Sequence, residues 1–194
     1  MRTNTRRLVL LALLTGLVIM LQFLGAFIRF GSFSISAVLV PIVIGSALFG
    51  MFAGLWLGLV FGVVVLATGD AAAFLAIDPA AAILVVLGKG AVAGLSAGAV
   101  YKLLESKNRT AAAIAAGVVC PVVNTGILVI GCYVFFLPTL TEWGMAAGFV
   151  SATAFIFIGM IGLNFLFELG LNIVLSPAIV RLIRQGQGKD YIYE

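Results

Sequence analysis

Long apolar runs with few interruptions make up nearly the whole chain. No charged residue occurs in residues 8–24, 30–69 or 111–136. A run of about 20 apolar residues is long enough for a helix to cross the hydrocarbon core of a membrane. Because the backbone in lipid must satisfy its own hydrogen bonds, such runs are typical of membrane-spanning helices. The sequence therefore predicts an all-α integral membrane protein.

Composition gives the same class and restricts the domain organisation. Hydrophobic residues make up 63% of the chain and charged residues only 9%, against about 25% charged residues in soluble domains. The 194 residues leave room for five to seven spans of about 20 residues and for no soluble domain. We predict a single six-transmembrane-helix bundle over residues 1–194, with helices at about 8–24, 36–49, 51–67, 79–103, 111–136 and 157–184.

The last apolar run, residues 149–183, is too long for one untilted span. We therefore expect its first part to form a lid or a short interfacial helix, with the last span starting near Phe157. That start places Glu168 about 16 Å below the outer end of the span. A start at Phe149 would instead move Glu168 to the inner surface.

The distribution of basic residues predicts the orientation. Nine of the eleven lysines and arginines fall on one side of a six-span arrangement, namely Arg2, Arg6, Arg7, Lys102, Lys107, Arg109, Arg181, Arg184 and Lys189. The positive-inside rule then puts both termini in the cytoplasm. Because these residues gather at span ends, the net charge of +4 indicates topology, and we expect no nucleic-acid partner.

A polar stripe interrupts the last apolar run. Asn164, Glu168 and Asn172 recur every fourth residue, so on a helix they share one face. A carboxylate at membrane depth costs roughly 2.5–3.5 kcal/mol on insertion scales, so a partner must compensate for it. Lys89 and Asn124 lie near the middle of two other apolar runs, and therefore at a similar depth. We predict that three helices wall a small-molecule site.

The residues alone leave other interpretations open. Lys89 and Glu168 can neutralise each other, and Asn124 can form an interhelical hydrogen bond worth about 0.6 kcal/mol. Residues 25–35, rich in phenylalanine and glycine, contain Arg29. They fit either an interfacial aromatic belt with a snorkelling arginine or a loop that gates a ligand.

Most enzyme chemistry lacks its usual residues. The chain has no histidine, which removes the commonest general base and metal ligand, and it has no nucleotide-binding loop. Cys120 and Cys132 would lie about 18 Å apart on one helix, too far for a disulfide. We predict no catalytic residue, metal or cofactor; an intramembrane enzyme built on Glu168, Lys89 and amides is the minor alternative.

Several segments together resemble one family. These are the basic N-terminus followed by the small residues Ala12 and Gly16; the segment 33–50 followed by glycines 54 and 58; Asn124-Thr-Gly; and the stripe over residues 164–172. With the six-span length, the chain resembles a substrate-binding S component of an energy-coupling factor (ECF) transporter. The resemblance covers nearly the whole chain.

The resemblance implies the substrate-capture subunit of an ABC-type importer in the plasma membrane of a prokaryote. It implies a vitamin or related micronutrient as ligand, and a membrane coupling (T) subunit and two ATPase subunits as partners. In that family the first helix docks on the coupling subunit through an Ala-xxx-Ala motif, and Ala12 and Gly16 match its spacing. Transport would proceed by toppling of the loaded bundle.

The resemblance also implies a ligand site on the outer side, formed by loops one, three and five and helices four to six. Mapped here, the candidates are Arg29, Asp70, Lys89, Asn124, Asn164, Glu168 and Asn172. Pantothenate would suit a lysine and carboxylate pair, whereas riboflavin would use the amides and the phenylalanines of loop one. The alternative from another class is a structural or assembly membrane protein whose polar residues only lock helices together.

Overall fold

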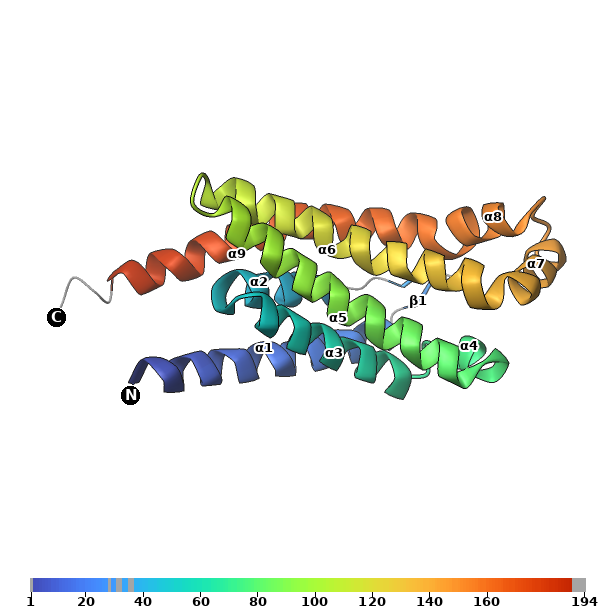
Figure 1. Ribbon diagram of the computed structural model, residues 1–194, viewed down its shortest axis with the longest axis horizontal. Helices are drawn as coiled ribbons and strands as arrows, with labels where there is room; N and C mark the ends of the chain where they lie inside the picture. The colour runs from blue at the N-terminus through green and yellow to red at the C-terminus, as the bar shows by residue number, and fades with distance from the viewer. Residues whose placement is uncertain (1, 28, 31–32, 35–36, 190–194) are drawn as a thin grey trace.

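The computed structural model describes residues 2–27, 29–30, 33–34 and 37–189 (Figure 1). Its elements in chain order are α1 (Arg2–Phe27), β1 (Arg29–Phe30), β2 (Phe33–Ser34), α2 (Leu39–Phe49), α3 (Met51–Ala67), α4 (Ala72–Ile77), α5 (Pro79–Leu104), α6 (Arg109–Gly131), the π-helical segment η1 (Cys132–Phe136), α7 (Leu137–Ala146), α8 (Ala152–Ala154), the π-helical segment η2 (Phe155–Ile161) and α9 (Gly162–Lys189).

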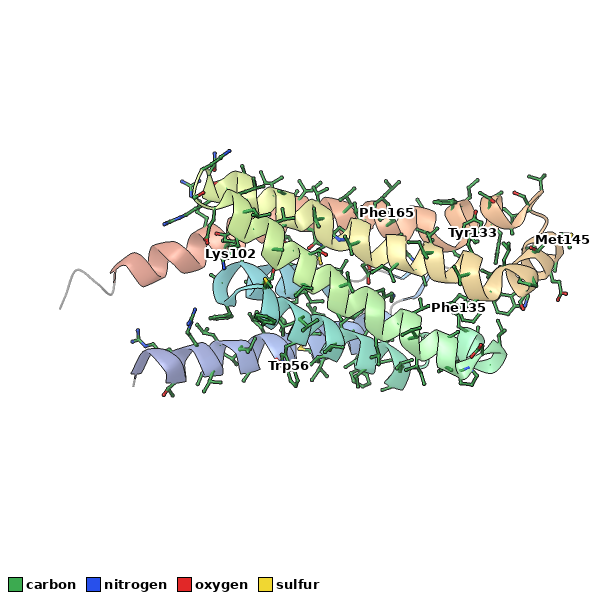
Figure 2. All side chains as sticks on the ribbon, viewed as in Figure 1. Trp56, Lys102, Tyr133, Phe135, Met145 and Phe165 are labelled. Carbon is green, nitrogen blue, oxygen red and sulfur yellow. The ribbon has the colours of Figure 1, made fainter. Side chains whose placement is uncertain are left out.

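The long helices lie along the long axis of an elongated bundle (Figure 1). Helix α1 begins and helix α9 ends at the same end of the bundle, which we call the proximal end. The short helices α4 and α7 lie at the opposite, distal end (Figure 1). The exposed Lys102 lies toward the proximal end (Figure 2).

Four helical runs among the described residues are long and apolar enough to cross a membrane. They are Thr5–Ala26, Pro79–Leu104, Arg109–Ala146 and Ala152–Ala178. Two further apolar helices, Leu39–Phe49 and Met51–Ala67, are shorter. The chain is thus an all-α, multi-pass membrane protein by helix length and composition, while the count of six spans and the cytoplasmic termini stay predictions.

Local sequence signals set the starts of α5 and α6. Asp78 caps α5, because its Oδ1 accepts a hydrogen bond from the backbone N–H of Ala81 at 3.0 Å, and Pro79 follows at the first helical position. Asn108 caps α6 in the same way through the N–H groups of Thr110 and Ala111. Both starts lie within two residues of those expected from the sequence.

The distal end is more helical than the sequence indicated. Helix α6 continues through η1 into α7, so residues 137–146, expected as loop, form helix. The last helical run begins at Ala152, where Ser151 caps α8 by accepting from the N–H of Ala154 at 3.2 Å. The segment η2 then joins α8 to α9, because its wider π-turns accommodate an extra residue without ending the helix. The segment before Phe157, expected to form a lid or a short interfacial helix, is from Ala152 onward part of a continuous helix.

Glycines bring the backbones of α3 and α5 into direct contact. A Cβ added to Gly58 would lie 2.0 Å from the carbonyl oxygen of Gly90, and one added to Gly54 would lie 2.2 Å from that of Gly94. Side chains larger than hydrogen would separate the two helices. These contacts hold the segment around Lys89 against α3.

Helix α2 is short because it begins inside the bundle. Ile42, in its first turn, lies against Gly94 near the middle of α5. Residues 38–47 are all buried. The small hairpin of β1 and β2, which pairs Arg29 with Ser34 and Phe30 with Phe33, precedes this helix, and β2 contacts α9.

Candidate functional site

The contact between α6 and α9 sets their register. A Cβ added to Gly117 would lie 2.7 Å from the carbonyl oxygen of Asn172. Because the two helices are antiparallel, each turn toward the distal end of α6 corresponds to one turn toward the start of α9. Asn164 and Glu168 therefore lie opposite the turn of α6 that contains Asn124.

The contact between α5 and α6 gives the level of Lys89 in the same way. Gly131 lies against Val85, and these helices are also antiparallel, so Lys89 lies opposite residue 127 of α6. Glu168 lies opposite residue 121. The backbone levels of the two charged residues thus differ by six residues of α6, about 9 Å along the bundle.

Asn124 lies one turn after Cys120 on α6, so the two side chains share a helix face. Both side chains are buried, so this face of α6 points into the bundle. We call Lys89, Asn124, Asn164 and Glu168 the central polar cluster.

The ammonium group of Lys89 is held by an aromatic ring. Its Nζ lies 5.4 Å from the ring centroid of Phe61 on α3, within the range of a cation–π interaction. Lys89 and Glu168 are both partly exposed although they lie in the middle of long helices.

The side chain of Asn124 is buried, with 5% of its surface exposed. Its Oδ1 accepts no hydrogen bond from the part of the chain that the structure describes. Leaving a buried acceptor unpaired costs about 1–3 kcal/mol. Such a group is a candidate for pairing with a bound molecule.

The amide of Asn172 has a different environment. Its Nδ2 donates to the backbone carbonyl of Glu168 at 2.8 Å, and its Oδ1 accepts from Ser176 Oγ at 3.4 Å. The side chain is buried where α9 packs on Gly117. These contacts favour a packing role for Asn172 over the predicted ligand contact.

The N-terminus of α2 lies close to the level of the cluster. Since Ile42 contacts Gly94, Leu39 lies about one turn further toward the distal end, beside Ala91 and near Lys89. The helix begins at Leu39, and the side chain of its N-cap residue Val38 forms no capping hydrogen bond. Non-helical backbone at such depth occurs where it is buried in protein or lines a water-filled cavity.

Asp70 belongs to a separate group of contacts at the turn between α3 and α4. Its Oδ2 accepts hydrogen bonds from Gln22 Nε2 on α1 and from Thr68 Oγ1, the latter at 3.2 Å. Gln22 is buried and was not predicted as a contact residue. The available signal was that Gln22 carries the only amide in residues 8–24. The side chain of Arg29 lies outside the described residues.

The small residues of α1 lie on its exposed side. Ala12 and Gly16 are both exposed, and a Cβ added to Gly16 would meet no atom within 4 Å. Beside this face, Trp56 of α3, labelled in Figure 2, donates from Nε1 to Thr15 Oγ1 at 3.2 Å, which joins α3 to α1. This leaves an apolar face of α1 open to lipid or to another subunit.

The fold and the central polar cluster define a multi-pass helical membrane protein with charged and amide groups inside its bundle. A family model described as the ECF transporter substrate-specific component matches residues 6–180. The chain belongs to this family, which confirms the resemblance. Its members are substrate-binding subunits of ECF importers, which work in the membrane with coupling and ATPase subunits. No curated protein and no solved structure matches the chain.

Proposed function

We propose that this chain captures a vitamin or related micronutrient from the outer side of a prokaryotic plasma membrane. The loaded subunit would then deliver it to a module of one coupling (T) subunit and two ATPase subunits for ATP-driven uptake. Membership in the family supports the general role. The central polar cluster is the proposed ligand site.

The observation that carries this proposal is the buried Oδ1 of Asn124, which accepts no hydrogen bond from the described residues. Charged groups in a membrane bundle cost several kcal/mol and are retained mainly for function. A bound molecule with donors would satisfy Asn124 and would also contact Lys89 and Glu168.

Entry from the distal side follows from the position of the cluster. Lys89 lies ten residues from the distal start of α5 at Pro79, about 15 Å along the helix. Toward the proximal side the buried α2 packs against α5, α6 and α9. If the distal end faces the outside, as the basic residues predict, we infer that the ligand enters from the outer side.

The first helix supplies the proposed contact with the coupling subunit. Ala12 and Gly16 form a shallow exposed track that another helix can approach closely. This surface lies on the far side of α1 from its buried residue Val18. Docking there would leave the ligand site undisturbed.

The test is mass spectrometry of the small molecules that denaturation releases from the detergent-purified protein. We expect the wild type to release a vitamin or vitamin precursor. The double variant Lys89→Met with Glu168→Gln should release none while its circular dichroism spectrum and elution volume stay those of the folded wild type.

The matched control is Lys102→Met with Glu142→Gln, which makes the same chemical changes at two exposed positions. This control should release as much ligand as the wild type. An empty wild type that also gains no thermal stability from a panel of vitamins would contradict the proposed function and favour a structural role for the polar residues.

A further inference from the structure

Donors and acceptors of the central polar cluster lie at different levels of the bundle. The cation Lys89 lies toward the distal end, opposite residue 127 of α6. The backbone positions of Asn124 and Glu168, whose side chains offer acceptors, lie nearer the proximal end. A ligand that satisfies all three groups must therefore carry an acceptor or an anionic group at one end and hydrogen-bond donors at the other.

We propose that the ligand is an acid with a donor-rich tail, bound with its acidic group toward the distal end at Lys89 and its N–H or O–H donors toward Asn124 and Glu168. This inference rests on the proposed function and adds the chemical class and the orientation of the ligand.

The part of the site at the level of Lys89, nearer the distal end, suits an anion for two reasons. The contact with Phe61 holds the ammonium of Lys89 at one ring face, and an ammonium has three donors to offer. The N-terminus of α2 lies at nearly the same level, and the positive end of its dipole favours negative charge. An anionic group of the ligand would thus meet two positive sources.

The proximal level requires donors. Oδ1 of Asn124 is a buried acceptor without a partner among the described residues. An ionised Glu168 is likewise acceptor-only. A ligand whose inner end lacks N–H or O–H groups would leave the Oδ1 of Asn124 unpaired, at a cost in binding free energy.

The chemistry of the two levels restricts the kind of ligand. The backbone levels of Lys89 and Glu168 differ by about 9 Å along the bundle. Pantothenate and biotin both carry a carboxylate at one end and donors at the other, whereas riboflavin carries no acidic group.

The first readout is the chemical nature of the molecule released from wild-type protein. An acid with distant N–H or O–H donors supports the proposal, and any released compound without an acidic group overturns it. Release of a compound without an acidic group would still support the proposed function. Failure of the ligand proposal can therefore be distinguished from failure of the proposed function. An empty protein that no vitamin stabilises would overturn both.

The second readout compares the released acid with its uncharged analogue, for example pantothenate with panthenol or biotin with its amide, by ligand affinity. Wild type should bind the acid at least about tenfold more tightly, the size of a buried charge-assisted hydrogen bond. Lys89→Gln should remove this preference. Glu168→Gln should lower the affinity for both compounds equally, and Lys102→Gln should leave both affinities unchanged.

A preference for the acid that survives Lys89→Gln, or that disappears in Glu168→Gln instead, would overturn the proposed orientation. Folding of each variant is checked by its circular dichroism spectrum. If Lys89→Gln does not fold, Lys89→Arg replaces it. Arginine keeps the charge in a larger, planar head group, so affinity for the acid should fall while its preference over the uncharged analogue is retained.

Discussion

Gly117 on α6 packs directly against the backbone carbonyl of Asn172 on α9. A Cβ added at position 117 would lie 2.7 Å from the oxygen of that carbonyl. This contact sets the register that brings Asn124 opposite Asn164 and Glu168. The alignment of polar groups from two helices thus depends on the absence of a side chain one to two turns away.

Gly117→Ala should destabilise the protein by about 1–3 kcal/mol, because α9 must move away from α6 to admit the methyl group. It should also weaken ligand binding, since Asn164 and Glu168 move with α9. The measurement is thermal unfolding in detergent with and without ligand. Gly126→Ala on the same helix is the control, because its Cβ would meet no atom within 4 Å; equal unfolding temperatures for the two variants would contradict the register.

Gly58→Ala should be more damaging, by about 3 kcal/mol or more. Its Cβ would lie 2.0 Å from the carbonyl oxygen of Gly90, where two backbones meet and no flexible side chain can move aside. Gly88→Ala, whose Cβ has open space around it, should be neutral or slightly stabilising through helix propensity. Thermal unfolding compares the two, and a stable Gly58→Ala protein would disprove the close contact of α3 and α5.

Asp70→Ala should cost about 1–3 kcal/mol, because it leaves the buried amide of Gln22 without its carboxylate partner. Adding Gln22→Leu removes the unpaired donor and should restore part of the loss. A double-mutant cycle from thermal unfolding measures the coupling. Glu142→Ala, which removes an exposed carboxylate on α7, is the control and should change stability little. Additive effects at positions 22 and 70 would rule out the interaction.

Gly16→Leu should leave the isolated protein as stable as the wild type, because the added side chain points into open space. It should nevertheless prevent close approach of a helix from the coupling subunit. Copurification of the tagged variant with the coupling and ATPase subunits measures this. Gly170→Leu places the same side chain at another exposed glycine, on α9, and should still assemble. Normal assembly of Gly16→Leu would move the docking surface elsewhere.

Much of the fold follows from local signals in the sequence. The start of α5 could be predicted because Asp78 and Pro79 act through bonds within one turn. The depth of Lys89 and Asn124 could be estimated because helical rise converts residue number into distance. The continuation through η1 and η2 could not be predicted, because a π-turn depends on packing around the helix more than on its own residues.

The sequence by itself determined the membrane class, the main helices and the residues that can carry charge at mid-depth. Hydropathy and helical rise depend only on the residues of one helix, so they can be evaluated without knowing which helices pack against it. Only the tertiary structure decided that Asn172 is hydrogen-bonded within α9, that the Oδ1 of Asn124 is buried without a partner, and that Asp70 contacts Gln22. Those outcomes depend on which helices are neighbours and on their register, and the close glycine contacts set both.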